Sequence, residues 1–150
     1  MYSSLLNFDQ DGMKEIIVIC GDSPGWLEGR ESWNKNIYIL DSQNGDYKLT
    51  WQKNTSKDFY PDLYAMGKPE IIDIDQDNVD EIFFSGAIWG GTCMGSSVFS
   101  FLYSPKYSEI FYIEKREQFD SACENILTST FTSPNIEKHK TFQDFLEKKL

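Results

Sequence analysis

The chain has 150 residues with a formal net charge of −10, and aromatic residues make up 15% of it. This length suits one domain with its own core, and the aromatic content argues against a disordered chain despite the charge. The acidic balance argues against nucleic acid as a partner, because phosphate is bound by a basic face, and no apolar run is long enough to span a bilayer.

The chain begins with "MYSSLLNFDQ", of which residues 2–8 are predicted to form a strand. This start lacks the basic flank and the long apolar segment of a signal peptide. Because the predicted strand begins at the second residue, the chain is also expected to be a fragment of a longer protein as one alternative. The sequence therefore leaves the compartment open.

Two segments of the chain repeat the same pattern: residues 7–18, "NFDQDGMKEIIV", and residues 73–84, "DIDQDNVDEIFF". Oxygen-bearing side chains stand at positions one, three and five, and a glutamate stands at position nine. Position six is Gly12 or Asn78, the residue types that best tolerate a left-handed backbone. The repeat predicts two carboxylate loops, each leading into a strand.

The segments around these loops are predicted to be strands. The runs "KEIIVIC" and "DEIFFSG" follow the loops and suit strands buried on both faces. A hairpin-like pair then follows in each copy, at residues 36–52 around "SQNGD" and at residues 97–115 around "SPK". The chain thus predicts two units of about four antiparallel strands, at residues 2–56 and 66–116, within residues 1–118.

The final segment, residues 119–150, contains no further copy of the motif. Capping-box patterns at residues 121–124 and 141–144 mark two helix starts. We predict a short helix near residues 121–127 and a C-terminal helix at residues 142–149. Together they would make this segment a helical cap or tail.

The spacing of the oxygen-bearing residues fits a hard cation, because alternating ligands before a tight turn wrap the chain around an ion. The loops are not EF-hands, since an EF-hand has a glutamate at position twelve, where Val18 and Phe84 stand. The pattern resembles the FG-GAP or VCBS-type repeat of integrin-like β-propellers. Repeats of that family carry an Asp-x-Asp-x-Asp-Gly-x-x-Asp loop followed by an apolar strand.

The resemblance covers roughly residues 2–115 and implies calcium in both loops. This chain departs from the family pattern with Asn7 at position one, with Asn78 at position six and with glutamate at position nine of both loops. These departures bear on affinity more than on fold. The implied ligands are side-chain oxygens and, at Met13 and Val79, backbone carbonyls: Asn7, Asp9, Asp11, Met13 and Glu15 in the first copy, and Asp73, Asp75, Asp77, Val79 and Glu81 in the second.

The expected fold class is mainly β, with two antiparallel propeller-blade-like sheets and a short C-terminal helical segment. Two units cannot close a propeller, which needs at least about four blades. Three arrangements remain open. The chain is a fragment of a longer propeller, or it associates with copies of itself or a partner through open sheet edges, or its sheets pack face to face under the C-terminal segment.

The sequence favours a non-enzymatic calcium-binding module for protein or glycan recognition, or a part of a larger propeller. No catalytic motif is present, and His139 lies in the polar stretch "IEKHKTF", where a solvated side chain is expected. Trp26, Trp33 and Trp89 lie in long connections and are candidate contacts for a partner, or caps on the core.

Two other function classes remain. One is a metal-free, small acidic binding protein of the immunity or adaptor type, in which the Asp-rich loops are ordinary turns. The other is a glycan-active enzyme whose remaining residues lie outside this chain, since paired carboxylates also serve glycoside hydrolysis.

Overall fold

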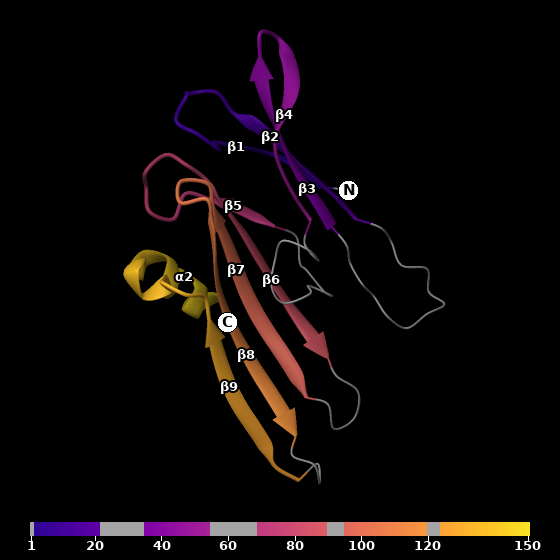
Figure 1. Ribbon diagram of the computed structural model, residues 1–150, viewed down its shortest axis with the longest axis vertical. Coiled ribbons are helices and arrows are strands. Elements are labelled where there is room, and N and C mark those ends of the chain that lie inside the picture. The colour runs from indigo at the N-terminus through magenta and orange to yellow at the C-terminus, as the bar shows by residue number, and fades with distance from the viewer. Residues whose placement is uncertain (1, 22–34, 55–68, 90–94, 120–123) are drawn as a thin grey trace, which may run out of the picture.

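The computed structural model describes residues 2–21, 35–54, 69–89, 95–119 and 124–150 (Figure 1). The described residues form nine strands, one short 3-10 helix and one α-helix. The strands make two antiparallel sheets, and these do not close into a barrel. The predicted fold class, two antiparallel sheets with a C-terminal helix, is therefore confirmed.

The first sheet has four strands in chain order. They are β1 (Tyr2–Leu6), β2 (Glu15–Gly21), β3 (Lys35–Gln43) and β4 (Asp46–Asn54). The turn between β3 and β4 is the predicted Asn44–Gly45 pair, and both residues have positive φ, at 56° and 88°. A two-residue turn of this kind matches the twist of the strands that it joins.

The second sheet has five strands, also in chain order. They are β5 (Glu70–Ile72), β6 (Glu81–Trp89), β7 (Ser96–Ser104), β8 (Glu109–Phe119) and β9 (Ile126–Thr132). The sequence predicts all of these except β9.

Strand β9 corrects the predicted short helix near residues 121–127. Residues 120–123 lie outside the described residues, but Ile126 and Leu127 pair with Phe119 and Gln118 of β8 in an antiparallel ladder. The segment "ILTSTFT" is rich in β-branched residues, which favour extended backbone. All seven residues of β9 are exposed, so its ladder with β8 is the contact that holds this segment.

The main core lies between the two sheets. Ile17, Ile19, Ile37 and Ile39 of the first sheet share one buried cluster with residues of the second sheet, which are Ile82, Phe84, Phe99, Phe101 and Tyr103. Buried residues alternate along β2 and β3, so one face of the first sheet supplies these contacts. The sheets therefore pack face to face, as in one of the three predicted arrangements.

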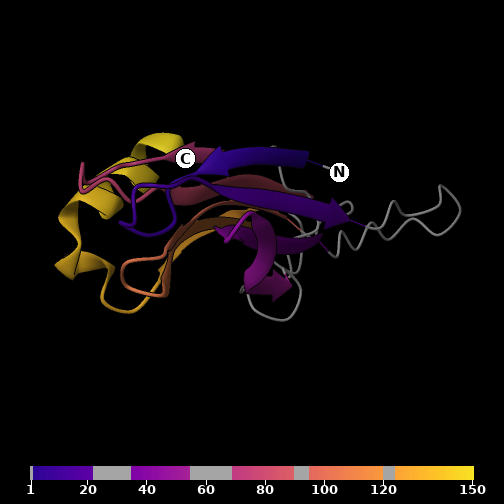
Figure 2. The same ribbon diagram turned by 90° about the horizontal axis from the view of Figure 1, so that it is seen from above.

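The C-terminal helix covers the opposite face of the second sheet. Helix α2 (Lys140–Lys149) follows the 3-10 helix η1 (Ile136–Lys138) and lies beside the second sheet in both views (Figures 1 and 2). Phe142 and Leu146 are buried against Phe83, whose neighbour Phe84 points to the other core. The predicted helix at residues 142–149 is confirmed, with a start two residues earlier.

Four ring-bearing residues singled out from the sequence are either placed differently from the expectation or lie outside the described residues. His139 is half-buried with its ring 4.5 Å from that of Tyr107 and 4.7 Å from that of Phe111, so the expected solvated side chain is wrong. Trp26 and Trp33 lie outside the described residues. Trp89 ends β6, and its side chain also lies outside the description.

Candidate metal centre

Two loops hold the candidate metal ligands, and each joins the first two strands of its sheet. The first loop (residues 7–15) links β1 to β2, and the second loop (residues 73–81) links β5 to β6. In both sheets the last residue of the first strand pairs with the glutamate at position nine, as Leu6↔Glu15 and Ile72↔Glu81. The two loops thus start and end at matching places in their sheets.

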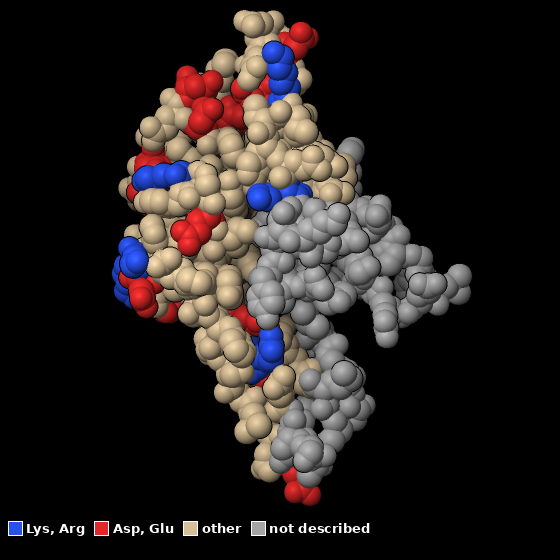
Figure 3. Space-filling view, in the orientation of Figure 1, with Lys and Arg blue, Asp and Glu red and all other residues tan. Residues whose placement is uncertain are grey.

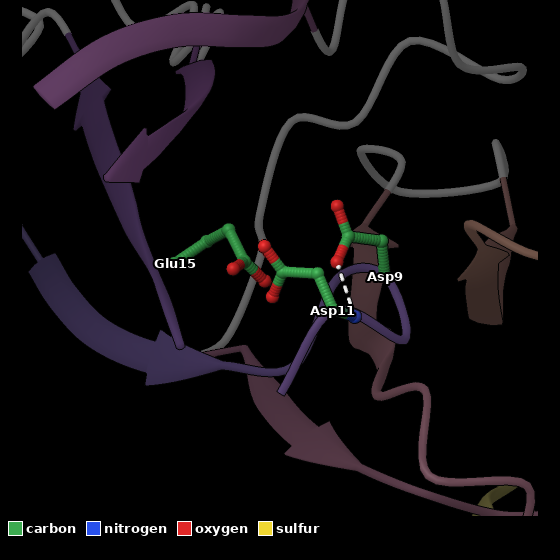
Figure 4. A group of neighbouring side chains, drawn as sticks. All are labelled: Asp9, Asp11 and Glu15. Carbon is green, nitrogen blue, oxygen red and sulfur yellow. Dashed lines mark hydrogen bonds between the residues drawn. The ribbon is translucent and has the colours of Figure 1, made fainter. Parts of the chain in front are cut away.

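The first loop brings three carboxylates together (Figure 4). Asp9, Asp11 and Glu15 each offer one oxygen, and these oxygens all lie within 4.8 Å of one another. The backbone N–H of Asp11 donates to Asp9 Oδ1 at 2.9 Å, and that of Met13 donates to Asp11 Oδ1 at 2.8 Å. Gly12 makes the turn at position six with a φ of 86°.

Glu15 is the buried member of this group. Its side chain is 1% exposed, and its Oε2 accepts a hydrogen bond from the Phe8 N–H at 2.5 Å. Its other oxygen, Oε1, is buried and has no hydrogen-bond partner in the described part of the chain. Burial raises the pKa of the Glu15 carboxyl above its usual range, and the Asp9 and Asp11 carboxylates act in the same direction. A buried, unpartnered carboxylate oxygen is costly unless a cation or a proton satisfies it.

The second loop also brings three carboxylates together, and it has more internal hydrogen bonds than the first loop. Asp73, Asp75 and Glu81 offer oxygens within 4.8 Å of one another. Both Asp73 oxygens accept backbone N–H groups, from Asp77 at 3.1 Å and from Asn78 at 2.9 Å. Asn78 has a φ of 68° at position six, where the first loop has glycine.

Glu81 occupies the buried position nine of the second loop and is fully partnered. Its Oε2 accepts from the Ile74 N–H and its Oε1 from the Ser104 hydroxyl, both at 3.1 Å. Its side chain is fully buried. Burial raises the pKa of Glu81 to about 7, and the neighbouring carboxylates of Asp75 and Asp77 also raise it.

Lys106 supplies a positive charge to the second loop. This residue lies in the turn between β7 and β8, and its Nζ is 2.7 Å from Asp77 Oδ2 and 3.3 Å from Asp75 Oδ2. Its contact with Asp77, and then that with Asp75, raises the pKa of the Lys106 ammonium. Burial is the largest single influence on Asp77 and would raise its pKa, but the Lys106 ammonium, the Val79 N–H and the Asp75 side chain together outweigh burial, so the pKa is lowered.

The two loops contact each other directly. Asn7 N–H donates to Asp80 Oδ2 at 2.7 Å, and Asp80 N–H donates to the Asn7 carbonyl at 2.7 Å. The Asn7 side-chain amide donates to the Asn78 carbonyl, and that of Gln10 donates to the Asp77 carbonyl at 3.1 Å. Four hydrogen bonds therefore connect the two loops, so a change of conformation in one loop would disturb the other.

The structure brings most of the predicted ligands together and places others differently. Asp77 is predicted at position five but lies outside the close group of the second loop and contacts Lys106. Met13 and Val79 donate their N–H groups to the carboxylates at position five. Their predicted role as carbonyl ligands stays a prediction.

Lys106 and Ser104 contact the second loop, and neither is among the residues predicted from sequence. Both come from the end of β7 or the turn after it, well away from the loop in sequence. The signal was available in the strand order, because a meander of antiparallel strands brings the β5–β6 loop and the β7–β8 turn to the same end of the sheet.

The donor set of both loops suits a metal ion. Carboxylate and amide oxygens are the ligands of hard divalent cations. Each loop has two buried oxygens without a hydrogen-bond partner among the described residues: Asn7 Oδ1 and Glu15 Oε1 in the first loop, and Asp75 Oδ1 and Asp77 Oδ2 in the second. The acidic groups Asp9, Asp11 and Glu15, and Asp73, Asp75 and Glu81, can each hold a metal ion.

Comparison with known protein families, with curated proteins and with solved structures finds no match. The fold and the loops nevertheless define a class, a mainly β protein of two packed sheets with paired acidic loops that can hold metal. Within the part of the chain that the structure describes, no helix has the length and apolar character needed to cross a membrane.

Proposed function

We propose that this protein is a non-enzymatic, calcium-stabilised β module of the FG-GAP or VCBS type, which acts in protein or glycan recognition or within a larger propeller. The observation that carries the proposal is the buried carboxylate of Glu15, which has an unpartnered oxygen beside two aspartates. Bound calcium would satisfy that oxygen and offset the repulsion among the three carboxylates. Its role is to fix the loop, and no chemical step depends on it.

Calcium is favoured over magnesium by the kind of ligand in the first loop. Magnesium keeps several waters and takes one or two carboxylates, whereas calcium accepts several protein oxygens in irregular geometry. The first loop offers three carboxylates and the Asn7 amide oxygen within a nine-residue span.

The proposal is tested by thermal unfolding of the protein in calcium and in excess chelator. A ligand that binds only the folded state adds about 2.7 kcal/mol at a hundred times its dissociation constant, which corresponds to about 5–10 °C in melting temperature. We expect this rise for the natural sequence and its loss in the Asp9→Asn, Asp11→Asn double variant. Magnesium at the same concentration serves as the control ion and should give a smaller rise.

An unchanged melting temperature in calcium would contradict the proposal and favour the metal-free acidic binding protein. That alternative is supported by the net charge of −10 and by the exposed carboxylates of Asp9 and Asp11. A complex of that kind would weaken steeply as salt is added, because salt screens exposed charges.

A further inference from the structure

We infer that the two loops take different cations: the first loop binds a calcium ion from solution, whereas the Lys106 ammonium is the resident cation of the second loop. The inference rests on the proposed function for the first loop. It predicts that the chain binds one calcium ion although it carries two copies of the acidic motif.

The contacts of Lys106 place its charge on the two central aspartates of the second loop. Its Nζ touches Asp75 Oδ2 and Asp77 Oδ2, at 3.3 and 2.7 Å. The aspartate side chains are 18% and 16% exposed, and that of Lys106 is 39% exposed. The ammonium thus lies against two half-buried carboxylates, where an incoming cation would otherwise bind.

The remaining carboxylate oxygens of the second loop are mostly engaged by protein donors. Asp73 accepts two backbone N–H groups, and Glu81 accepts one backbone N–H and the Ser104 hydroxyl. Asp77 Oδ1 accepts the Val79 N–H at 2.8 Å. Two buried oxygens of this loop have no hydrogen-bond partner among the described residues, Asp75 Oδ1 and Asp77 Oδ2, and the Lys106 ammonium lies 2.7 Å from Asp77 Oδ2.

The first loop differs from the second because no ion pair among the described residues reaches its unpartnered oxygens. Its buried Glu15 keeps one unpartnered oxygen, as does the side chain of Asn7. None of the ion pairs among the described residues reaches this loop, because all of them involve Asp75, Asp77, Glu114, Asp144 or Glu70. In Figure 3, red atoms gather over the β1–β2 loop without blue among them, whereas red and blue touch over the β5–β6 loop.

A tethered ammonium is a strong competitor for a small site. A group held on a short linker acts at an effective concentration of about millimolar or more, and Lys106 is held in a four-residue turn beside the loop. A divalent ion that entered the second loop would have to displace the ammonium, because like charges at this distance repel. The first loop presents no such barrier in the described residues.

The experiment is a calcium titration by calorimetry of the chelator-stripped full chain. We expect one ion for the natural sequence and two for Lys106→Gln, with the second loop gaining about tenfold or more in calcium affinity. Lys106→Arg keeps the positive charge and should still bind one ion. Lys115→Gln, at an exposed position of β8, is the matched control and should also bind one ion.

A triple variant assigns the sites. Asp9→Asn and Asp11→Asn combined with Lys106→Gln should leave one ion, bound by the second loop. Lys106→Met repeats the test with a side chain that cannot bind the aspartates. Circular dichroism confirms that each variant is folded.

The outcomes separate this inference from the proposed function. Two ions of similar affinity in the natural sequence, or one ion in both Lys106→Gln and Lys106→Met, would overturn the inference and leave calcium binding intact. No ion in the natural sequence but one in Lys106→Gln would overturn the proposed first-loop site and keep the role of Lys106. No ion in any variant would overturn both.

Discussion

Asn7 shows how one residue can serve both loops. It stands at position one of the first loop, where the second loop has Asp73. In the structure its amide nitrogen donates to the Asn78 carbonyl of the second loop, and its amide oxygen is buried without a partner. An aspartate has no side-chain donor at neutral pH, so it could not make the bridge. The asparagine is therefore explained by the contact between the loops.

We expect Asn7→Asp to destabilise the protein in chelator by about 1–2 kcal/mol, because a carboxylate would then face the Asn78 carbonyl. Urea unfolding in excess chelator measures this change. Gln118→Glu, which adds the same charge at an exposed position of β8, is the control and should stay within about 0.5 kcal/mol. A variant as stable as the natural sequence would show that the amide bridge contributes nothing.

The candidate site was predictable from sequence only as far as local spacing reaches. Alternating oxygens and a left-handed residue at position six identify the loops, and Gly12 and Asn78 indeed have positive φ. The satisfied or unsatisfied state of each oxygen depends on distant residues. Ser104 and Lys106 reach the second loop from another hairpin, so local spacing could not distinguish the two loops.

At the scale of elements, α2 was predictable from its local sequence, whereas β9 depends on residues that are distant in the chain. The spacing of apolar residues in the sequence of α2 is enough to predict the helix, and the predicted start lies two residues from the observed one. The capping-box pattern at residues 121–124 is also local, but β9 is stabilised by its ladder with β8. Tertiary pairing decides the structure of a short segment whose apolar side chains stay exposed.

Leu146 tests the contribution of α2 to stability. Its side chain is fully buried between the helix and the second sheet, in the cluster that contains Phe83 and Leu102. We expect Leu146→Ala to lower the free energy of unfolding by about 2–5 kcal/mol, because it loses burial and leaves a cavity.

Urea unfolding measures the effect of this substitution. The exposed Lys148 of the same helix provides the control, and Lys148→Ala should change stability by no more than about 0.5 kcal/mol. A loss of less than about 1 kcal/mol for Leu146→Ala would mean that α2 does not pack as described.

At the scale of the whole molecule, the two sheets share one core. The Trp51 ring of the first sheet lies 4.6 Å from the Tyr103 ring of the second, and Phe8 of the first loop packs near both. The loops are hydrogen-bonded to each other at the same end. Neither sheet can therefore unfold without exposing the apolar face of the other, and small domains of this size usually unfold in one step.

This arrangement predicts that calcium in the first loop protects both sheets equally. Backbone amides of β2 and β3 and those of β6 and β7 that exchange by global unfolding should all slow by the same factor, about a hundredfold at a hundred times the dissociation constant. Hydrogen exchange followed by mass spectrometry, in calcium and in chelator, measures both sets in one experiment. The Asp9→Asn, Asp11→Asn variant should show no slowing in either sheet.

The contrasting result is slowing confined to β1 and β2. It would mean that the first sheet opens on its own and that the shared cluster does not couple it to the second. Equal slowing would instead mean that an ion held by one loop stabilises the whole described fold. The second loop would then not need a calcium ion of its own. Lys106 could remain against its aspartates without lowering the free energy of unfolding, because the two sheets share one core.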